Sequence, residues 1–139
     1  MCAYDGTIFR VRFHDTDHSG RVFFANYVKW MDDDITEFFR SKGITFPDIQ
    51  KTLVHSEIVE GTFVVGEFSC RIQAPSKYDD VVKVRSRVAE VRTKVLRFES
   101  EVLDANTEQK LANGSITYVW VKGESSAPIP AQILKSLQS

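Results

Sequence analysis

The sequence predicts an α+β fold in which an antiparallel β-sheet curls around one long central α-helix. Apolar and polar residues alternate near the N-terminus, a pattern typical of a half-buried strand. From about residue 24 to residue 42 the apolar residues recur at three- and four-residue spacing, which indicates an amphipathic helix. The rest of the chain alternates again in long segments joined by short turns, and short turns connect antiparallel neighbours.

The first predicted strand covers residues 7–14, where Phe9, Val11 and Phe13 alternate with polar residues. Residues 15–20 follow as a turn, because aspartate side chains accept backbone N–H bonds and Gly20 is free to adopt a positive φ. The helix predicted over residues 24–42 contains no proline and ends at Gly43, a C-terminal cap. Its apolar face needs a sheet to lie on.

Four or five further strands are expected after a loop that contains Pro47. Short turns such as residues 75–80 separate the later strands. Pro128 and Pro130 precede a short helix, and a proline suits the first turn of a helix. The expected strands cover residues 52–59, 64–74, 82–88, 96–102 and 111–121, and the helix covers residues 131–137.

Length and composition favour a single domain over residues 1–139. The 18 Lys and Arg residues nearly balance 19 Asp and Glu residues, so the chain lacks the basic excess typical of a nucleic-acid-binding domain. No apolar run approaches the ~18 residues of a membrane span, and no signal segment opens the chain. Cys2 and Cys70 cannot form a disulfide framework, and Cys70 lies in an apolar stretch typical of a buried thiol. We expect a cytoplasmic protein.

The densest polar cluster comes directly before the predicted helix and comprises His14, Asp15, Asp17 and His18. One interpretation is a metal site. Outside this cluster, His55 is the only further histidine that could act as a ligand, and because no second ligand cluster is present we expect no bound metal. A second interpretation is a turn whose acids accept backbone amides, which stays open for Asp15.

The third interpretation of this cluster is catalytic. A carboxylate just before a helix lies close to unpaired helix N–H groups, and these can stabilise the oxyanion formed from a carbonyl. The carboxylate can attack that carbonyl or activate a water beside it. Phe23, Phe24 and Tyr27 would provide an apolar wall, and Gly20 would allow close backbone approach. The chemistry indicated is acyl transfer to water.

Other features carry weaker signals. The chain contains no Gly-x-Ser-x-Gly motif and no glycine-rich phosphate loop. Residues 32–34 are three aspartates that we assign to the solvent side of the helix, and Trp30 and Trp120 to packing. Several cations surround the predicted hairpin near residue 93, either as a solvated strand face or as an anion patch for a phosphorylated group. These cations are Arg85, Arg87, Arg92, Lys94 and Arg97.

Two stretches resemble the 4-hydroxybenzoyl-CoA thioesterase branch of the hot-dog superfamily. They are residues 11–30, VRFHDTDHSGRVFFANYVKW, and residues 75–80, PSKYDD, with the Val- and Arg-rich strand that follows. The resemblance spans roughly residues 7–121 and implies a sheet wrapped around one long helix. It also implies hydrolysis of an acyl- or aryl-CoA thioester without a metal or cofactor, coenzyme A being part of the substrate.

The resemblance also implies site residues. It places the catalytic carboxylate on Asp17 and the carbonyl-polarising backbone N–H on Phe24, with Tyr27 near the acyl pocket; we add Phe23 as a second substrate-binding residue. Arg92 and Lys94 would meet the CoA phosphates. Hot-dog subunits pair into dimers and tetramers with active sites between subunits, so we expect a homo-oligomer.

The sequence departs from this pattern at one position. Many relatives carry Tyr or His where this chain has Phe24, and a phenyl ring cannot donate a proton, so the amide role alone remains and the aryl or aliphatic preference stays open. We expect an acyl-CoA thioesterase in which Asp17 acts as nucleophile or general base. The alternative is a non-catalytic hot-dog module that binds acyl-CoA as a sensor or carrier. A hydratase is disfavoured, because His55 is the only distant histidine.

Overall fold

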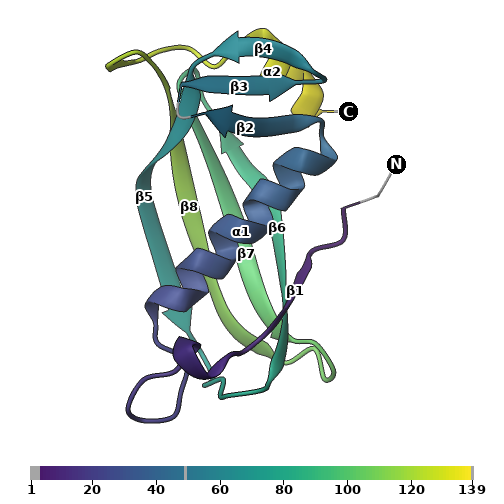
Figure 1. Cartoon of the computed structure of the whole chain (residues 1–139), viewed down its shortest axis with the longest axis vertical. Coiled ribbons are helices and arrows are strands. Elements are labelled where there is room, and N and C mark those ends of the chain that lie inside the picture. The colour runs from purple at the N-terminus through teal and green to yellow at the C-terminus, as the bar shows by residue number, and fades with distance from the viewer. Residues whose placement is uncertain (1–3, 49, 139) are drawn as a thin grey trace.

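A long helix, α1 (Ala25–Ser41), lies across one face of a curled antiparallel sheet in the computed structural model, which describes residues 4–48 and 50–138 (Figure 1). The main sheet has the strand order β1-β6-β7-β8-β5, with β9 paired to β8, and a smaller sheet has the order β2-β3-β4. The elements are β1 (Thr7–Arg10), a 3-10 turn (Phe13–Asp15), α1, β2 (Ile44–Asp48), β3 (Lys51–Val54), β4 (Glu57–Glu60), β5 (Thr62–Ile72), β6 (Val81–Val91), β7 (Val95–Asp104), β8 (Lys110–Lys122), β9 (Ser125–Ser126) and α2 (Ala131–Leu137).

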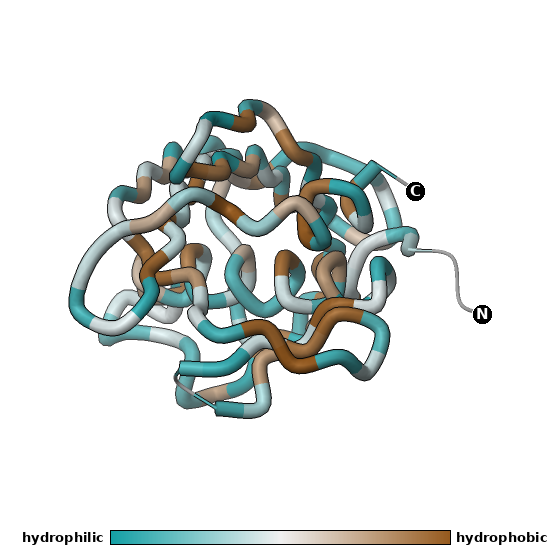
Figure 2. Tube along the Cα trace, turned by 90° about the horizontal axis from the view of Figure 1, so that it is seen from above, coloured by the Kyte–Doolittle hydropathy of each residue, from teal (hydrophilic) through white to brown (hydrophobic). Residues whose placement is uncertain are grey.

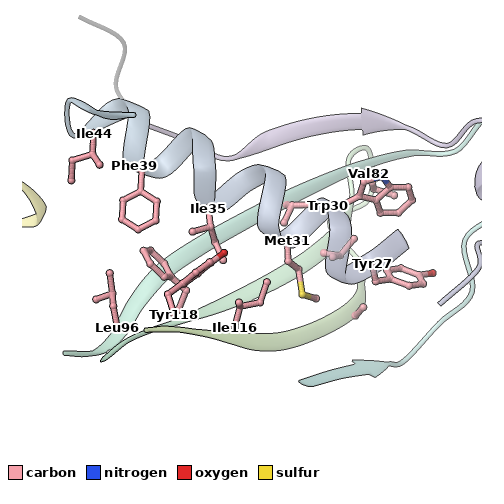
Figure 3. Close-up of a cluster of buried hydrophobic side chains, with 14 of the residues drawn as sticks. Tyr27, Trp30, Met31, Ile35, Phe39, Ile44, Val82, Leu96, Ile116 and Tyr118 are labelled. Atoms are coloured by element: carbon pink, nitrogen blue, oxygen red, sulfur yellow. The ribbon is translucent and has the colours of Figure 1, made fainter. Parts of the chain in front are cut away.

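The core forms between one stripe of α1 and the inner face of the main sheet. Tyr27, Met31, Ile35 and Phe39 recur every four residues, so they lie on one side of the helix and are at most 2% exposed. Figure 3 shows these side chains directed from the helix toward the strands. Each large apolar side chain buried in this way contributes about 1.5–3 kcal/mol. Their partners on the sheet are Val82, Val84, Leu96, Phe98, Ile116, Tyr118 and Trp120.

Alternation along the long strands creates that inner face. In β7 every second residue from Leu96 to Val102 is buried, while the residues between them are partly exposed. Figure 2, seen from the end that carries β2, β3 and β4, shows hydrophobic and hydrophilic residues alternating along the chain. The predicted antiparallel sheet, long helix, tight turns and C-terminal helix are therefore confirmed, and Trp30 and Trp120 are buried as expected.

The helix also begins and ends where the sequence predicts. Phe24 is the N-cap of α1, and Gly43 follows the helix with φ +79°, a conformation that glycine adopts without strain. A Cβ atom at position 43 would lie 2.4 Å from the ring of His55, so only glycine fits there. No helix within residues 4–48 and 50–138 is long and apolar enough to cross a membrane.

Three predicted segments differ in detail. The strand expected over residues 7–14 ends at Arg10, because Asp15 accepts the Arg12 N–H through its carboxylate and donates its own N–H to the Arg12 carbonyl, which winds residues 12–15 into a turn. The Pro47 segment is strand β2, at the edge of the small sheet, where a residue without an N–H is tolerated. The single strand expected over residues 52–59 is the hairpin β3–β4, which turns at two residues of positive φ, His55 and Ser56.

The assignment of all three aspartates of α1 to the solvent side is wrong. Asp34 is fully buried and accepts hydrogen bonds from the hydroxyls of Tyr4 (2.5 Å), Thr7 (2.7 Å) and Ser86 (2.6 Å). Burial raises the pKa of its carboxyl, although these hydrogen bonds oppose the shift. Asp32 accepts a hydrogen bond from Tyr118 at 2.6 Å, and only Asp33 is exposed. Asp34 therefore joins the N-terminal segment and β6 to the helix.

We predict that Asp34→Ala lowers the free energy of unfolding by about 2 kcal/mol, because it leaves buried hydroxyls without their acceptor. Urea unfolding followed by circular dichroism measures this. Asp33→Ala is the matched control, one residue away on the exposed side, and should change stability by less than about 0.5 kcal/mol. Equal losses in the two variants would contradict a structural role for the buried carboxylate.

Candidate active site

Asp15 organises the loop that enters α1. Its side chain is only 10% exposed; one carboxylate oxygen accepts the Arg12 N–H at 2.8 Å. Its backbone carbonyl accepts the Phe23 N–H at 2.8 Å and the Asn26 side-chain amide at 2.9 Å. Both ends of the loop are thus tied to one residue. Of the two acids in the motif, Asp15 has the turn-stabilising contacts that the second interpretation expected.

Asp17 lies at the turn of the same loop, in a different environment. Its Oδ1 accepts hydrogen bonds from the Ser19 hydroxyl at 2.5 Å and the Ser19 N–H at 2.8 Å. These bonds, with a smaller contribution from His18, hold the pKa of the Asp17 carboxyl below its ordinary value, so it is ionised at neutral pH. Its carbonyl accepts the Gly20 N–H at 3.0 Å, and Gly20 has φ +82°. Within residues 4–48 and 50–138, the second oxygen of Asp17 has no hydrogen-bond partner.

Asp17 lines a pocket of about 450 Å³ at the N-terminus of α1. The loop before the helix, the first turn of the helix and the end of β5 with the turn after it form its walls; all lie at the lower end of the molecule in Figure 1. The lining residues are Asp17, Ser19, Arg21, Val22, Phe24, Tyr27, Ile72, Gln73, Ala74 and Pro75. The pocket therefore combines one carboxylate, one guanidinium and a wall of both polar and apolar side chains.

Phe24 also lines this pocket. It is the N-cap of α1, and its N–H has no acceptor among the described residues. Amides in the first turn of a helix have no partner within the helix, and the helix dipole makes this end favourable for negative charge. Two residues that carry a carboxylate and an unpaired amide thus line one pocket. Together such groups can polarise a carbonyl and attack it or direct a water to it.

The two aromatic residues predicted to bind substrate lie differently. Tyr27 lines the pocket with a buried ring, and its hydroxyl donates to Ser76 at 3.2 Å; burial raises its pKa, so it stays protonated. Phe23 does not line the pocket and packs against Phe24 with ring centroids 4.6 Å apart. Sequence reasoning missed Ser19 and Arg21, although both belong to the motif, and the wall at the end of β5, which is distant in sequence.

Arg92 and Lys94 are not brought to this pocket within one chain. They lie at the β6–β7 hairpin, where Val95 pairs with Val119, which in turn faces Val64 near the start of β5. The pocket lies at Ile72, eight residues further along β5, or ~26 Å. The CoA-binding assignment therefore requires another chain or a different position for the CoA phosphates.

The other cations near this hairpin are paired rather than free. Arg85 contacts Glu101 at 3.1 Å, Arg87 contacts Glu99, and Arg97 lies between Glu90 and Glu99. Arg92 also pairs with Glu90, at 2.6 Å. These ion pairs, some across β6 and β7 and some between residues two apart, fit a solvated strand face better than an anion patch.

The groups considered for metal binding or thiol chemistry are dispersed. Within the residues that the structure describes, no three His, Cys, Asp or Glu side chains are close enough to hold a metal ion. His55 contacts Ser136 at 3.1 Å, far along the chain from the Asp17 loop. Cys70 is half-buried, and burial raises the pKa of its thiol, which disfavours the reactive thiolate. Cys2 lies outside the described residues.

A curled antiparallel sheet around one long helix is the hot-dog fold, and the class of protein defined here is a thioester hydrolase of that fold. The chain belongs to the thioesterase-like superfamily, whose sequence pattern matches residues 11–137. The family and the fold expected from the motif are thereby confirmed.

Individual relatives agree with this membership. The 4-hydroxybenzoyl-CoA thioesterase of Pseudomonas sp. (strain CBS-3) is 34% identical over 87 residues, which are 61% of this chain and 57% of that protein. The acyl-CoA thioester hydrolase YbgC of Escherichia coli O6:H1 is 28% identical over 104 residues, 75% of this chain and 71% of that protein. The solved structure of the BH1999 gentisyl-coenzyme A thioesterase is similar with a TM-score of 0.79 at 27% identity, covering 94% of this chain and 99% of that chain.

We predict that Ser19→Ala raises the pKa of the Asp17 carboxyl toward its ordinary value. The Ser19 hydroxyl donates a hydrogen bond to Asp17 that stabilises the ionised carboxylate, and the variant loses this bond. NMR titration of the carboxyl carbon measures the shift. When the pH is lowered, the Asp17 carboxylate of the variant becomes protonated at a higher pH than that of the wild type. Any activity that needs the ionised carboxylate should therefore be lost at a higher pH in the variant. Ser125→Ala, at an exposed serine on β9, is the control. An unchanged titration would show that the hydroxyl does not hold this carboxylate in solution.

Proposed function

We propose that this protein hydrolyses acyl-CoA thioesters, with Asp17 as the catalytic carboxylate. One observation carries the proposal: Asp17 and Phe24 line the same pocket, and among the described residues one Asp17 carboxylate oxygen and the Phe24 N–H have no partner. A thioester carbonyl between these groups would be polarised on one side and attacked from the other. The membership in a thioesterase family supports the same reaction.

The proposed step needs only groups of this chain and water. As a general base, Asp17 takes a proton from water while the water oxygen bonds to the thioester carbon. The carbonyl oxygen becomes an oxyanion that accepts the Phe24 N–H, and the helix dipole favours its charge. Collapse of the tetrahedral intermediate breaks the C–S bond, and the CoA thiolate leaves and takes up the proton. As a nucleophile, a carboxylate oxygen of Asp17 would instead bond to the thioester carbon, the C–S bond would break and the CoA thiolate would leave. Water would then hydrolyse the resulting anhydride to the free acid and the Asp17 carboxylate, and the proton released would go to the thiolate.

The phenyl ring of Phe24 can take no part in proton transfer, so its contribution is the backbone amide. Val22, Tyr27, Ala74 and Pro75 offer the acyl group an apolar surface. We propose no metal and no cofactor, since coenzyme A enters as part of the substrate.

We further propose that two copies pair through β5. This strand is the edge of the main sheet, and its apolar side chains are exposed: Val65 is 51%, Phe68 60% and Ile72 45% exposed. A long apolar edge strand favours pairing with another strand. An antiparallel two-fold pairing would reverse the second copy, so that its β6–β7 hairpin comes to the pocket end of the first. Arg92 and Lys94 of the second copy would then meet the CoA phosphates.

We predict that Asp17→Asn lowers the turnover of acyl-CoA by at least about a thousandfold, because the amide neither accepts the proton nor attacks the carbonyl. Thiol release from short, long and aromatic acyl-CoAs measures this and identifies the preferred acyl group. Asp48→Asn, at an exposed aspartate on β2, is the control. Near-normal turnover in a folded Asp17→Asn variant would refute the assignment.

The same assay separates the enzyme from a non-catalytic acyl-CoA-binding module. A module would bind acyl-CoA in calorimetry and release no thiol with any of the esters. An enzyme releases thiol in step with acid formation. This comparison needs only the wild-type protein.

Mixed oligomers test whether each site draws on two copies. Asp17→Asn and the double variant Arg92→Gln/Lys94→Gln are each expected to be impaired, the latter through KM. After co-refolding at equal amounts, half of the dimers are mixed and each has one intact site, so about a quarter of the sites should regain wild-type activity. If Arg92 and Lys94 serve the pocket of their own chain, mixing restores nothing beyond the average of the two.

A further inference from the structure

Of the lysines and arginines that the structure describes, Arg21 alone lines the Asp17 pocket. Its backbone is fixed by the loop, because its carbonyl accepts the Asp17 N–H at 2.9 Å. The residue on its other side, Val22, is buried and donates its N–H to Ser76 at 2.8 Å. The Arg21 side chain therefore starts from a backbone segment that hydrogen bonds hold in place, and it lines the same pocket as Asp17.

A second cation stands beside it. Arg21 and Lys77 are partners in an antiparallel bridge between the Asp17 loop and the turn after β5. Side chains of directly opposed residues project to the same side with Cβ atoms about 4.5–5.5 Å apart. Both side chains are exposed to solvent, and like charges in this position repel each other. An anion bound between them would therefore be attracted by both cations.

No protein group provides that anion among the residues that the structure describes. Neither the Arg21 guanidinium nor the Lys77 ammonium forms an ion pair or hydrogen bond there. The neighbouring acids are engaged elsewhere: Asp17 with Ser19, Asp79 with Arg10 at 3.2 Å, and Asp80 with the backbone N–H of Lys77 at 3.0 Å. The paired arginines on the outer face of the sheet form the contrast, since each has a carboxylate partner there.

We propose that Arg21, assisted by Lys77, binds a carboxylate at the far end of the acyl group, so that the preferred substrates are CoA thioesters of dicarboxylic acids. This inference rests on the proposed function and specifies its substrate class. The apolar wall of Val22, Tyr27 and Pro75 would hold the carbon chain between the two polar ends of the pocket. A carboxylate and a guanidinium form charge-assisted, often bidentate hydrogen bonds.

The phosphates of coenzyme A fit this cation pair less well. The thioester would lie at Asp17 and Phe24, and the whole pantetheine arm separates a thioester from the CoA phosphates. Arg21 is four residues from Asp17 and hydrogen-bonded to its backbone, which places it near the thioester. A group attached to the acyl side therefore reaches Arg21 more directly than the nucleotide does.

Matched pairs of substrates test the proposal: butyryl-CoA with succinyl-CoA, and hexanoyl-CoA with adipoyl-CoA. In each pair the carbon chain has the same length and only the terminal carboxylate differs. The wild type should prefer the carboxylate member. Arg21→Gln should lower kcat/KM for that member by about fivefold or more, mainly through KM, and by less than about twofold for the neutral member. Lys77→Gln should act in the same direction, and Arg21→Lys should retain part of the preference.

Lys122→Gln, at an exposed lysine at the other end of β8, removes the same charge away from the pocket and should leave the ratio unchanged. Equal kcat/KM for both members of each pair in the wild type would overturn the proposal. A loss in Arg21→Gln that is equal for both members would overturn it too, and would assign the cation pair to a CoA phosphate.

Calorimetric binding of non-hydrolysable thioether analogues of the same pairs keeps the two proposals separate. If the wild type hydrolyses neither member, the proposed function fails. The Arg21 inference is then decided by whether wild-type protein binds the carboxylate analogue about fivefold more tightly than Arg21→Gln does. If neutral esters are hydrolysed and the analogues bind without discrimination, the Arg21 inference alone fails.

Discussion

The packing of one stripe of α1 against the inner face of the main sheet is the constraint on which the rest of the structure depends. Met31, Ile35 and Phe39 are fully or almost fully buried against it, so the axis and rotation of the helix are fixed. The buried ring of Tyr27 extends this contact to the first turn and holds the helix N-terminus over the end of β5. The pocket forms because the N-terminus of α1 lies next to the end of β5.

The two aspartates of the loop before the helix, Asp15 and Asp17, have different roles. Asp15 is buried and accepts the bonds that close the loop, whereas Asp17 lines the pocket and has one carboxylate oxygen without a partner among the described residues. A buried carboxylate with partners stabilises a turn, and a solvent-facing one held ionised by a hydroxyl is available for chemistry. Two acids separated by one residue in the same motif thus meet opposite requirements.

The long strands of the main sheet place the pocket and the β6–β7 hairpin at opposite ends of the molecule. The pocket lies at one end of β5 and the Arg92 hairpin at the other, so the two are not brought together within one subunit. The exposed apolar edge of β5 offers the symmetric solution proposed above, in which reversal of a second copy joins opposite ends. In this arrangement Arg21, which is close to Asp17, would contact the acyl group of the substrate as proposed above.

The sequence by itself determined the fold class, the helix with its Phe24 start and Gly43 end, the long strands, and the motif that holds Asp17, because periodicity, caps and turn residues are local signals. Only the tertiary structure decided which aspartates are buried, since Asp34 finds its hydroxyl partners on segments far away in the chain. It also decided that Arg21 faces Lys77 and that Arg92 lies far from the pocket. Such contacts depend on strand register and chain reversal, which no local pattern encodes.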